Sequence, residues 1–219
     1  MVLHLVKKDI LIAKKFVFVA MLVVIAVPLL IMLTAPSIPG FLPFLYMVVI
    51  GELLLLQAIS QEEAKYPKAV ALLCAAPYTR SAFVKAKYIF FILIFAYCCV
   101  VNTLLMLVIN KQPNSLDLTA MLAVLLVSVI IYGIYMPIEF KYGLVKAKFV
   151  FMIAIFAFSL GPTIFATIFA NFFANITIDF SALAAISSGV KNIVLALASI
   201  AVFGISMMVS TKIFSKKEL

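Results

Sequence analysis

The chain has 219 residues, of which 67% are apolar and 11% are charged, and its formal net charge is +9. Charged residues make up about a quarter of ordinary globular domains, so this composition excludes a soluble domain. The basic residues lie in short gaps between long apolar runs, which argues against nucleic-acid binding and is typical of a membrane protein that sets its own orientation.

Residues 1–15 begin the chain with an amphipathic pattern. Leu3, Val6, Ile10 and Ala13 share one helical face, and most of the basic side chains fall on the others. We therefore expect residues 1–15 to form an interfacial helix that lies along a membrane surface. The alternative is a disordered basic tail that only fixes the topology.

Six apolar segments follow, each close to the roughly 20 residues that a helix needs to cross a bilayer. Because only helices satisfy their own backbone polar groups in lipid, these segments predict an all-α polytopic membrane protein with six transmembrane helices. We expect residues 1–219 to form a single transmembrane domain, in which residues 171–189 are an extracellular connection. The predicted spans are Phe16–Leu33, Phe41–Ser60, Tyr88–Ile109, Leu118–Pro137, Phe149–Ala170 and Ile193–Thr211.

Basic residues are divided unequally between the two sets of connections. The N-terminus, the 61–87 stretch, the 139–148 turn and the C-terminal tail hold fifteen of the 17 lysines and arginines. The opposite connections hold only Lys111 and Lys191. The positive-inside rule therefore predicts that both termini are cytoplasmic, in agreement with an even number of spans.

The longest polar stretch, residues 61–87, joins the second and third spans on the predicted cytosolic side. We interpret it as a coupling segment of two short helices broken at Pro77, on which a separate motor protein acts, with Thr79 as the N-cap of the helix that follows. Apolar anchors at helical spacing suit docking into a partner's groove, and a charged rim fixes the register. The alternative is an interfacial helix resting on lipid headgroups. The predicted docking residues are Glu62, Glu63, Lys65, Val70, Leu73, Cys74 and Arg80.

Glu52 is the one acidic residue well inside a predicted span, about ten residues from each end and so roughly 15 Å deep. A charge there costs at least ~2.5–3.5 kcal/mol, so the side chain should face protein or water, or be protonated. Ser128 and Tyr132 fall at a similar depth and are candidate hydrogen-bond partners for it. These three residues are candidates for a translocation path or gate, and the alternative is a polar lock between packed helices.

Motifs for chemistry are missing from the sequence. It contains no GxxxxGK[ST] phosphate-binding loop, no HExxH motif and only one histidine. Cys98 and Cys99 lie inside a predicted span, where cysteines act as small apolar residues and indicate neither a disulfide framework nor a metal site. We therefore expect no catalytic residue, metal or cofactor, and any uphill movement must be driven by a partner or an ion gradient.

Two motifs resemble those of the permease subunit of ABC-2-type transporters, and the order of elements is also similar. The first motif runs from Gln61-Glu62-Glu63 through Pro77-Tyr78-Thr79-Arg80 to Val84-Lys85-Ala86-Lys87-Tyr88. The second motif is Met136-Pro137-Ile138-Glu139-Phe140-Lys141-Tyr142-Gly143. Ala64 departs from the bulky polar or aromatic residue that usually follows the acidic pair.

The resemblance implies a permease of the bacterial plasma membrane that pairs with an identical or sister permease on two cytosolic ATPase subunits. Those partners would bind ATP and Mg²⁺, and the cargo would be hydrophobic or amphipathic, such as a peptide, and move outward. Two other functions stay open: a carrier driven by an ion gradient through Glu52, and a non-transporting protein such as an immunity or assembly factor. The carrier is disfavoured because no repeated pair of broken helices surrounds a midplane site.

Overall fold

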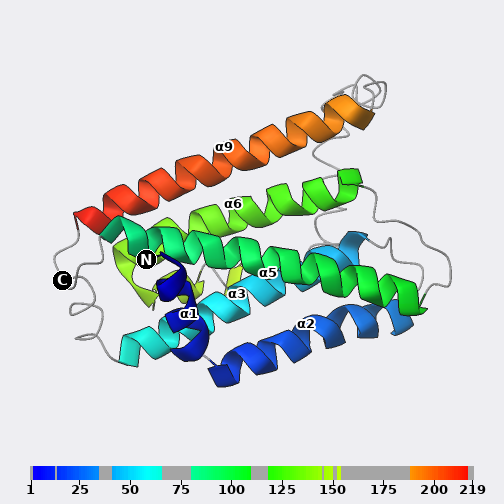
Figure 1. Cartoon of the computed structure of the whole chain (residues 1–219), viewed down its shortest axis with the longest axis horizontal. Coiled ribbons are helices and arrows are strands. Elements are labelled where there is room, and N and C mark those ends of the chain that lie inside the picture. The colour runs from blue at the N-terminus through cyan, green and yellow to red at the C-terminus, as the bar shows by residue number, and fades with distance from the viewer. Residues whose placement is uncertain are drawn as a thin grey trace.

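The computed structural model describes residues 2–12, 14–34, 41–65, 80–109, 118–144, 146–149, 152–153 and 188–216. The regular structure in these ranges is helical. The long helices pack into a bundle, and α1 lies across one end of it (Figure 1). The labelled helices are α1 (Val2–Ile12), α2 (Lys14–Thr34), α3 (Phe41–Lys65), α5 (Arg80–Ile109), α6 (Leu118–Tyr142) and α9 (Ser188–Ser215).

Four of the described helices, α3, α5, α6 and α9, are long and apolar enough to cross a membrane. Together, α1 and α2 add a fifth candidate if they are taken as one broken span, with an angle of 83° between them. The expected helical fold class is thereby confirmed. The predicted fifth span, Phe149–Ala170, and the connection at 171–189 lie almost wholly outside the described residues, so six spans remain a prediction.

Both α3 and α5 extend beyond the predicted spans into the 61–87 stretch. The first continues to Lys65, and the second begins at Arg80, directly after the predicted N-cap Thr79. The early part of α5 packs into the bundle, where Phe83 and Val84 are buried. Residues 66–79, which include the predicted break at Pro77, lie outside the described residues.

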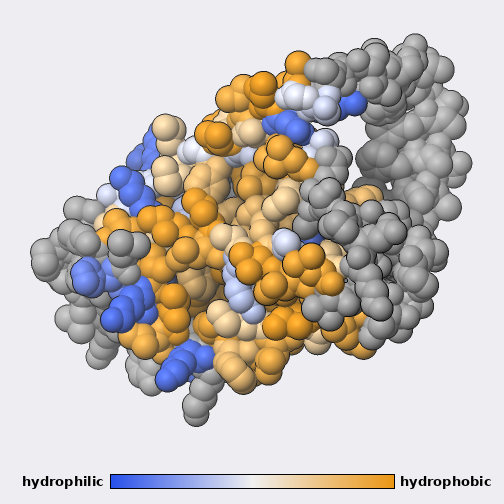
Figure 2. All heavy atoms as spheres, turned by 45° about the vertical axis from the view of Figure 1, so that its right-hand side comes forward, coloured by the Kyte–Doolittle hydropathy of each residue, from blue (hydrophilic) through white to orange (hydrophobic). Residues whose placement is uncertain are grey.

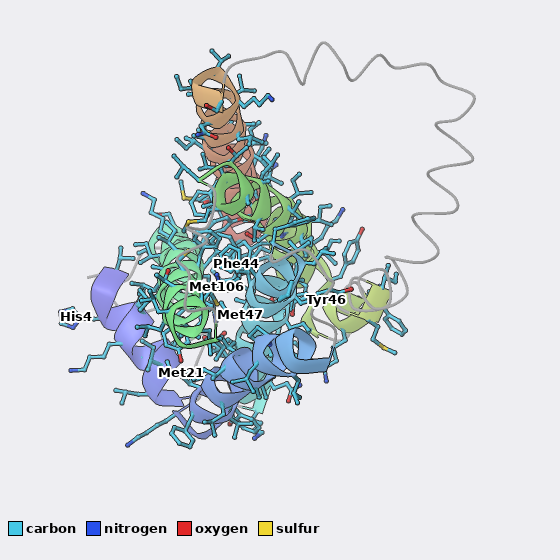
Figure 3. The ribbon with its side chains drawn as sticks, turned by 90° about the vertical axis from the view of Figure 1, so that its right-hand side faces the viewer. His4, Met21, Phe44, Tyr46, Met47 and Met106 are labelled. Carbon is cyan, nitrogen blue, oxygen red and sulfur yellow. The ribbon has the colours of Figure 1, made fainter. Side chains whose placement is uncertain are left out.

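The centre of the bundle is formed by α3 and α5, which contribute to both apolar clusters of the core. Phe44 and Met47 on α3 are almost fully buried and lie among the helices when the bundle is viewed along its length, whereas His4 on α1 points away (Figure 3). Outward side chains are mostly apolar, including Ile200 and Met208 on α9 at 69% and 72% exposure. Among the coloured residues of the view in Figure 2, hydrophobic side chains predominate and the hydrophilic ones gather mainly near one end. This distribution suits a protein surrounded by lipid.

The ends of α3, α6 and α9 and the start of α5 lie at the end of the bundle where α1 crosses (Figure 1). These are the ends next to the basic connections. The arrangement therefore agrees with a single basic side, which the positive-inside rule predicts to be cytosolic.

Close packing of α2 against α3 depends on Gly51. A Cβ added there would lie 2.6 Å from Cγ2 of Val24, a side chain that is 2% exposed. We expect Gly51→Ala to lower the free energy of unfolding by about 1–3 kcal/mol, because a packed helix would have to shift. The measurement is the midpoint of SDS-induced unfolding in detergent micelles.

The matched control is Gly204→Ala on α9, because no heavy atom of the described residues lies within 4 Å of its added Cβ. This change should be neutral or slightly stabilising, since alanine is the better helix former. Equal losses in the two variants would contradict this account of the α2–α3 contact.

Candidate functional site

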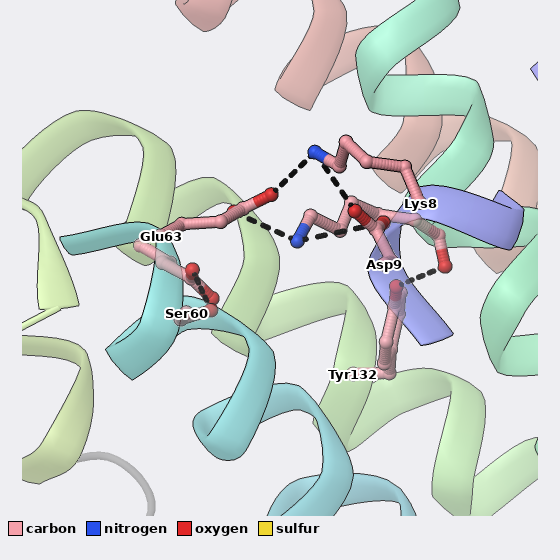
Figure 4. A network of polar contacts seen from close by, with 7 residues as sticks. Lys8, Asp9, Ser60, Glu63 and Tyr132 are labelled. Carbon is pink, nitrogen blue, oxygen red and sulfur yellow. Dashed lines mark hydrogen bonds and ion pairs between the residues drawn. The ribbon is translucent and has the colours of Figure 1, made fainter. Parts of the chain in front are cut away.

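Four charged side chains from three helices form a closed ring at the end of the bundle where α1 lies (Figure 4). The Lys8 Nζ lies 2.9 Å from Asp9 Oδ1 and 3.0 Å from Glu63 Oε1. The Lys87 Nζ lies 2.9 Å from Glu63 Oε2 and 3.7 Å from Asp9 Oδ2. Each lysine therefore contacts both carboxylates, and each carboxylate uses a different oxygen for each lysine. We call these four residues the charge ring.

The charge ring is shielded from solvent. The side chains of Lys87 and Asp9 are each 2% exposed, and those of Glu63 and Lys8 are 13% and 21% exposed. The Phe83 ring centroid lies 5.2 Å from the Lys8 Nζ and 5.5 Å from the Lys87 Nζ, within the range of cation–π attraction. Burying an unbalanced ion costs several kcal/mol, and here two positive and two negative charges cancel.

The fold brings these residues to one level because α3 and α5 run antiparallel. Glu63 lies in the last turn of α3, and Lys87 lies near the start of α5. Further along the same pair, a Cβ added at Gly51 would lie 3.8 Å from the Cys98 Sγ, which shows the same opposed direction. The first helix crosses at this level and contributes its adjacent lysine and aspartate.

Hydrogen bonds connect the surroundings of the charge ring to α6. The Tyr132 hydroxyl donates to the backbone carbonyl of Lys87 at 2.8 Å. The Ser60 hydroxyl donates to the carboxylate of Glu139. A displacement of the end of α3 or the start of α5 would therefore act directly on α6 through these two hydrogen bonds.

A second set of hydrogen bonds reaches α9. The Tyr88 hydroxyl shares hydrogen bonds with Ser206 at 2.6 Å and with Ser210 at 2.9 Å. The Ser206 hydroxyl also contacts the backbone carbonyl of Gly133 at 3.0 Å. Polar contacts therefore link the helix that carries Lys87 to both α6 and α9.

The predicted docking residues lie in different surroundings. Glu62 pairs with Lys65 at 2.6 Å at the exposed end of α3. Glu63 points into the charge ring, so its carboxylate is occupied by the two ring lysines of the same chain. Arg80 begins α5. Val70, Leu73 and Cys74 lie outside the described residues.

Glu52 is 3% exposed, and its Oε1 forms no hydrogen bond with any described residue. The two hydroxyl groups considered as hydrogen-bond partners of Glu52 donate to other acceptors. Ser128 donates to the carbonyl of Leu125 at 3.0 Å, because a helical serine readily reaches a carbonyl of its own preceding turn. Tyr132 donates to the carbonyl of Lys87 at the charge ring. The predicted hydrogen bonds to Glu52 are therefore not the ones formed.

One face of α1 packs against the bundle. Leu5, Val6 and Asp9 are buried, whereas Ile10 is 39% exposed. This buried face includes an acid, which pairs with Lys8 and Lys87.

Sequence reasoning missed Lys87 by counting it among the exposed basic residues of the 61–87 stretch. A signal was present, because Phe83, Val84 and Phe91 lie three or four residues away on the same helical face. All three are buried. A lysine in the middle of such an apolar face indicates a buried cation that needs an acidic partner.

These features define a multi-pass helical membrane protein with a buried ionic junction at one end. The model of a family described as ABC-2 family transporter protein matches residues 4–215. The chain therefore belongs to that family, and the resemblance seen in the two motifs is confirmed. It is a transmembrane component of an ABC transporter and is not itself the catalytic part. No curated protein and no solved structure matches the chain.

Proposed function

We propose that the chain is the permease subunit of an ATP-driven exporter in the bacterial plasma membrane, with both termini in the cytoplasm. A separate cytosolic ATPase binds ATP and Mg²⁺ and supplies the energy. The permease works as a pair, with a second copy or a sister subunit. Family membership over residues 4–215 and the one-sided distribution of basic residues support this proposal.

The charge ring is the observation that carries the proposal. Residues 66–79, which contain the predicted docking anchors, connect α3 to α5 in the chain. The Glu63–Lys87 pair joins those two helices at 2.9 Å, near the end of α3 and the start of α5. A force applied to the connection by an ATPase therefore reaches a closed ionic junction. From there it passes to α1 through Asp9 and to α6 through Tyr132.

A hydrophobic or amphipathic cargo is supported by an apolar groove between α5, α6 and α9. The groove has a volume of about 360 Å³, and its lining includes Phe91, Val129 and Phe203. Sites of this size and composition bind ligands mainly by burying their apolar surface. A peptide with an apolar face is one cargo of this kind.

Copurification and ATPase stimulation test the proposal. The permease, coexpressed with a candidate cytosolic ABC ATPase, should copurify with it and increase its ATP hydrolysis in proteoliposomes. Charge reversal at the predicted rim, by Glu62→Lys and Arg80→Glu, should lower this stimulation by roughly 1.5- to fivefold each, because rim ion pairs contribute about 0.2–1 kcal/mol. Lys111→Glu, on the opposite predicted side, is the control and should have no effect.

A chain that never copurifies with an ATPase, or rim variants that stimulate like the wild type, would contradict the proposal. The carrier alternative is favoured by one observation, which is that Glu52 is buried and its Oε1 has no hydrogen-bond partner in the described part of the chain. Under that alternative, the chain alone would move cargo with an ion gradient and no nucleotide, and Glu52→Gln would abolish the movement.

A further inference from the structure

A second apolar groove lies between α6 and α9. It has a volume of about 260 Å³, and its lining includes Ile134 and Pro137 from α6 and Ile205 and Val209 from α9. Among the described residues its sides stay open, with Ile134 53% and Ile205 62% exposed. In a bilayer, an open groove of this kind faces acyl chains.

On α6 the groove leads to a lysine. Ile130, Ile134 and Lys141 lie on one helical face, at spacings of four and seven residues. Lys141 is exposed and lies about one turn beyond Pro137, the last groove residue on this helix.

On α9 the same pattern recurs. Ile205, Val209 and Lys212 share one face, and Lys212 is exposed about one turn beyond the groove. Ser206 contacts the carbonyl of Gly133 at 3.0 Å, and α6 and α9 run side by side in the same direction (Figure 1). The two lysines therefore lie at the same end of the groove, one on each flank.

A turn after α6 adds a third cation. Gly143 adopts a φ of +81°, a left-handed conformation that suits glycine, and its N–H donates to the carbonyl of Glu139 at 2.8 Å. This turn ends α6 and brings Lys146 back to Tyr142. The Nζ atoms of Lys141 and Lys146 each lie 5.0 Å from the Tyr142 ring centroid, and Tyr142 is 51% exposed.

None of Lys141, Lys146 and Lys212 forms an ion pair with an acidic side chain of the described ranges. Three positive charges and an exposed tyrosine thus mark the end of an apolar groove. Lysine and tyrosine at the end of a spanning helix are typical of the headgroup level of a bilayer.

We propose that this site binds an anionic phospholipid, with an acyl chain in the α6–α9 groove and the phosphate at Lys141 and Lys212. The groove alone would accept any lipid, and the cations select a negatively charged headgroup. A lipid suits the site better than a docked protein because both lysines continue the outward faces that carry the exposed isoleucines. Lys146 and Tyr142 lie beside the proposed position of the headgroup.

A fluorescence experiment on the full-length chain tests the proposal. The chain contains no tryptophan, so Met208→Trp, at a side chain that is 72% exposed on α9, places one fluorophore beside the groove. The variant is reconstituted in phosphatidylcholine nanodiscs that contain brominated phosphatidylglycerol or brominated phosphatidylcholine. Brominated phosphatidylglycerol should quench the tryptophan fluorescence at a mole fraction at least about tenfold lower than brominated phosphatidylcholine requires. The reason is that each lysine near the surface contributes about a fivefold preference for the anionic lipid.

The double change Lys141→Gln and Lys212→Gln should reduce this preference to about fivefold or less, because only Lys146 keeps its charge. Arginine at both positions should retain it, since the charge is kept. Lys7→Gln is the matched control, because Lys7 is an exposed lysine on α1 away from the groove, and it should leave the preference unchanged.

Three results would overturn the proposal. One is that the double glutamine variant keeps the full preference. Another is that millimolar inorganic phosphate removes the preference when sulfate of equal ionic strength does not, which would assign the cations to a free phosphate. The third is that no lipid preference exists and the glutamine variants lose ATPase stimulation, which would assign the lysines to protein docking.

Discussion

Replacing Lys87 by methionine is expected to lower the free energy of unfolding by about 3–5 kcal/mol. The change leaves the Glu63 carboxylate with one cation in place of two and removes one of the two contacts of Asp9, in a place where water is largely excluded. The measurement is the midpoint of SDS-induced or thermal unfolding of the purified chain in detergent.

Lys85→Met is the matched control for this prediction, because Lys85 is exposed and lies two residues earlier on the same helix. It should change the midpoint little. Combining Lys87→Met with Glu63→Gln should recover part of the loss, because the Lys8–Asp9 pair at 2.9 Å remains balanced. If Lys85→Met and Lys87→Met are equally destabilising, the ring is not the buried junction that the contacts indicate.

Asp9→Asn is expected to lower cargo-stimulated ATP hydrolysis by the transporter complex by roughly tenfold, the size of a coupling free energy of about 1–3 kcal/mol. The change removes the carboxylate that links α1 to Lys87. The distance between Asp9 Oδ2 and Lys87 Nζ, 3.7 Å, is the longest in the charge ring, and the Glu63–Lys87 pair stays intact. The permease should therefore still assemble with the ATPase but transmit its motion poorly. The readouts are ATP hydrolysis in proteoliposomes and protease cleavage within α1.

His4→Gln provides the control on the exposed face of the same helix and should hydrolyse ATP at the wild-type rate. Asp9→Glu keeps the charge and should restore part of the stimulation. The unfolding midpoint distinguishes a variant that is folded but couples poorly to the ATPase from a variant that is unfolded. Wild-type stimulation in Asp9→Asn, or an equal loss in His4→Gln, would show that α1 takes no part in coupling.

Much of the fold was predictable because apolar segment length and the position of basic residues are local properties. The second, third, fourth and sixth predicted spans lie within α3, α5, α6 and α9. The boundaries were less predictable, because a helix does not end where its side chains become polar. Thus α3 continues through Glu62 and Glu63 to Lys65, and α5 begins eight residues before Tyr88.

The candidate site was predictable only in part, because it depends on pairing between distant segments. Glu63 was singled out, but as a rim charge facing a partner, and its pairing with Lys8 and Lys87 follows from how α1 crosses the bundle. Ser128 and Tyr132 were considered as partners of Glu52, but their hydroxyls donate to the carbonyls of Leu125 and Lys87. Residue depth can be counted along a helix, whereas the direction of a hydroxyl depends on which carbonyl is nearest after packing.

The position of Lys87 in the chain also bears on biogenesis. A ribosome makes Asp9 and Lys8 long before it makes Lys87, so the nascent N-terminal helix has no complete set of partners when it first meets the membrane. Its ion pairs with Glu63 and Lys87 can form only after α3 and α5 have been made, so the completion of the charge ring is a late event in maturation.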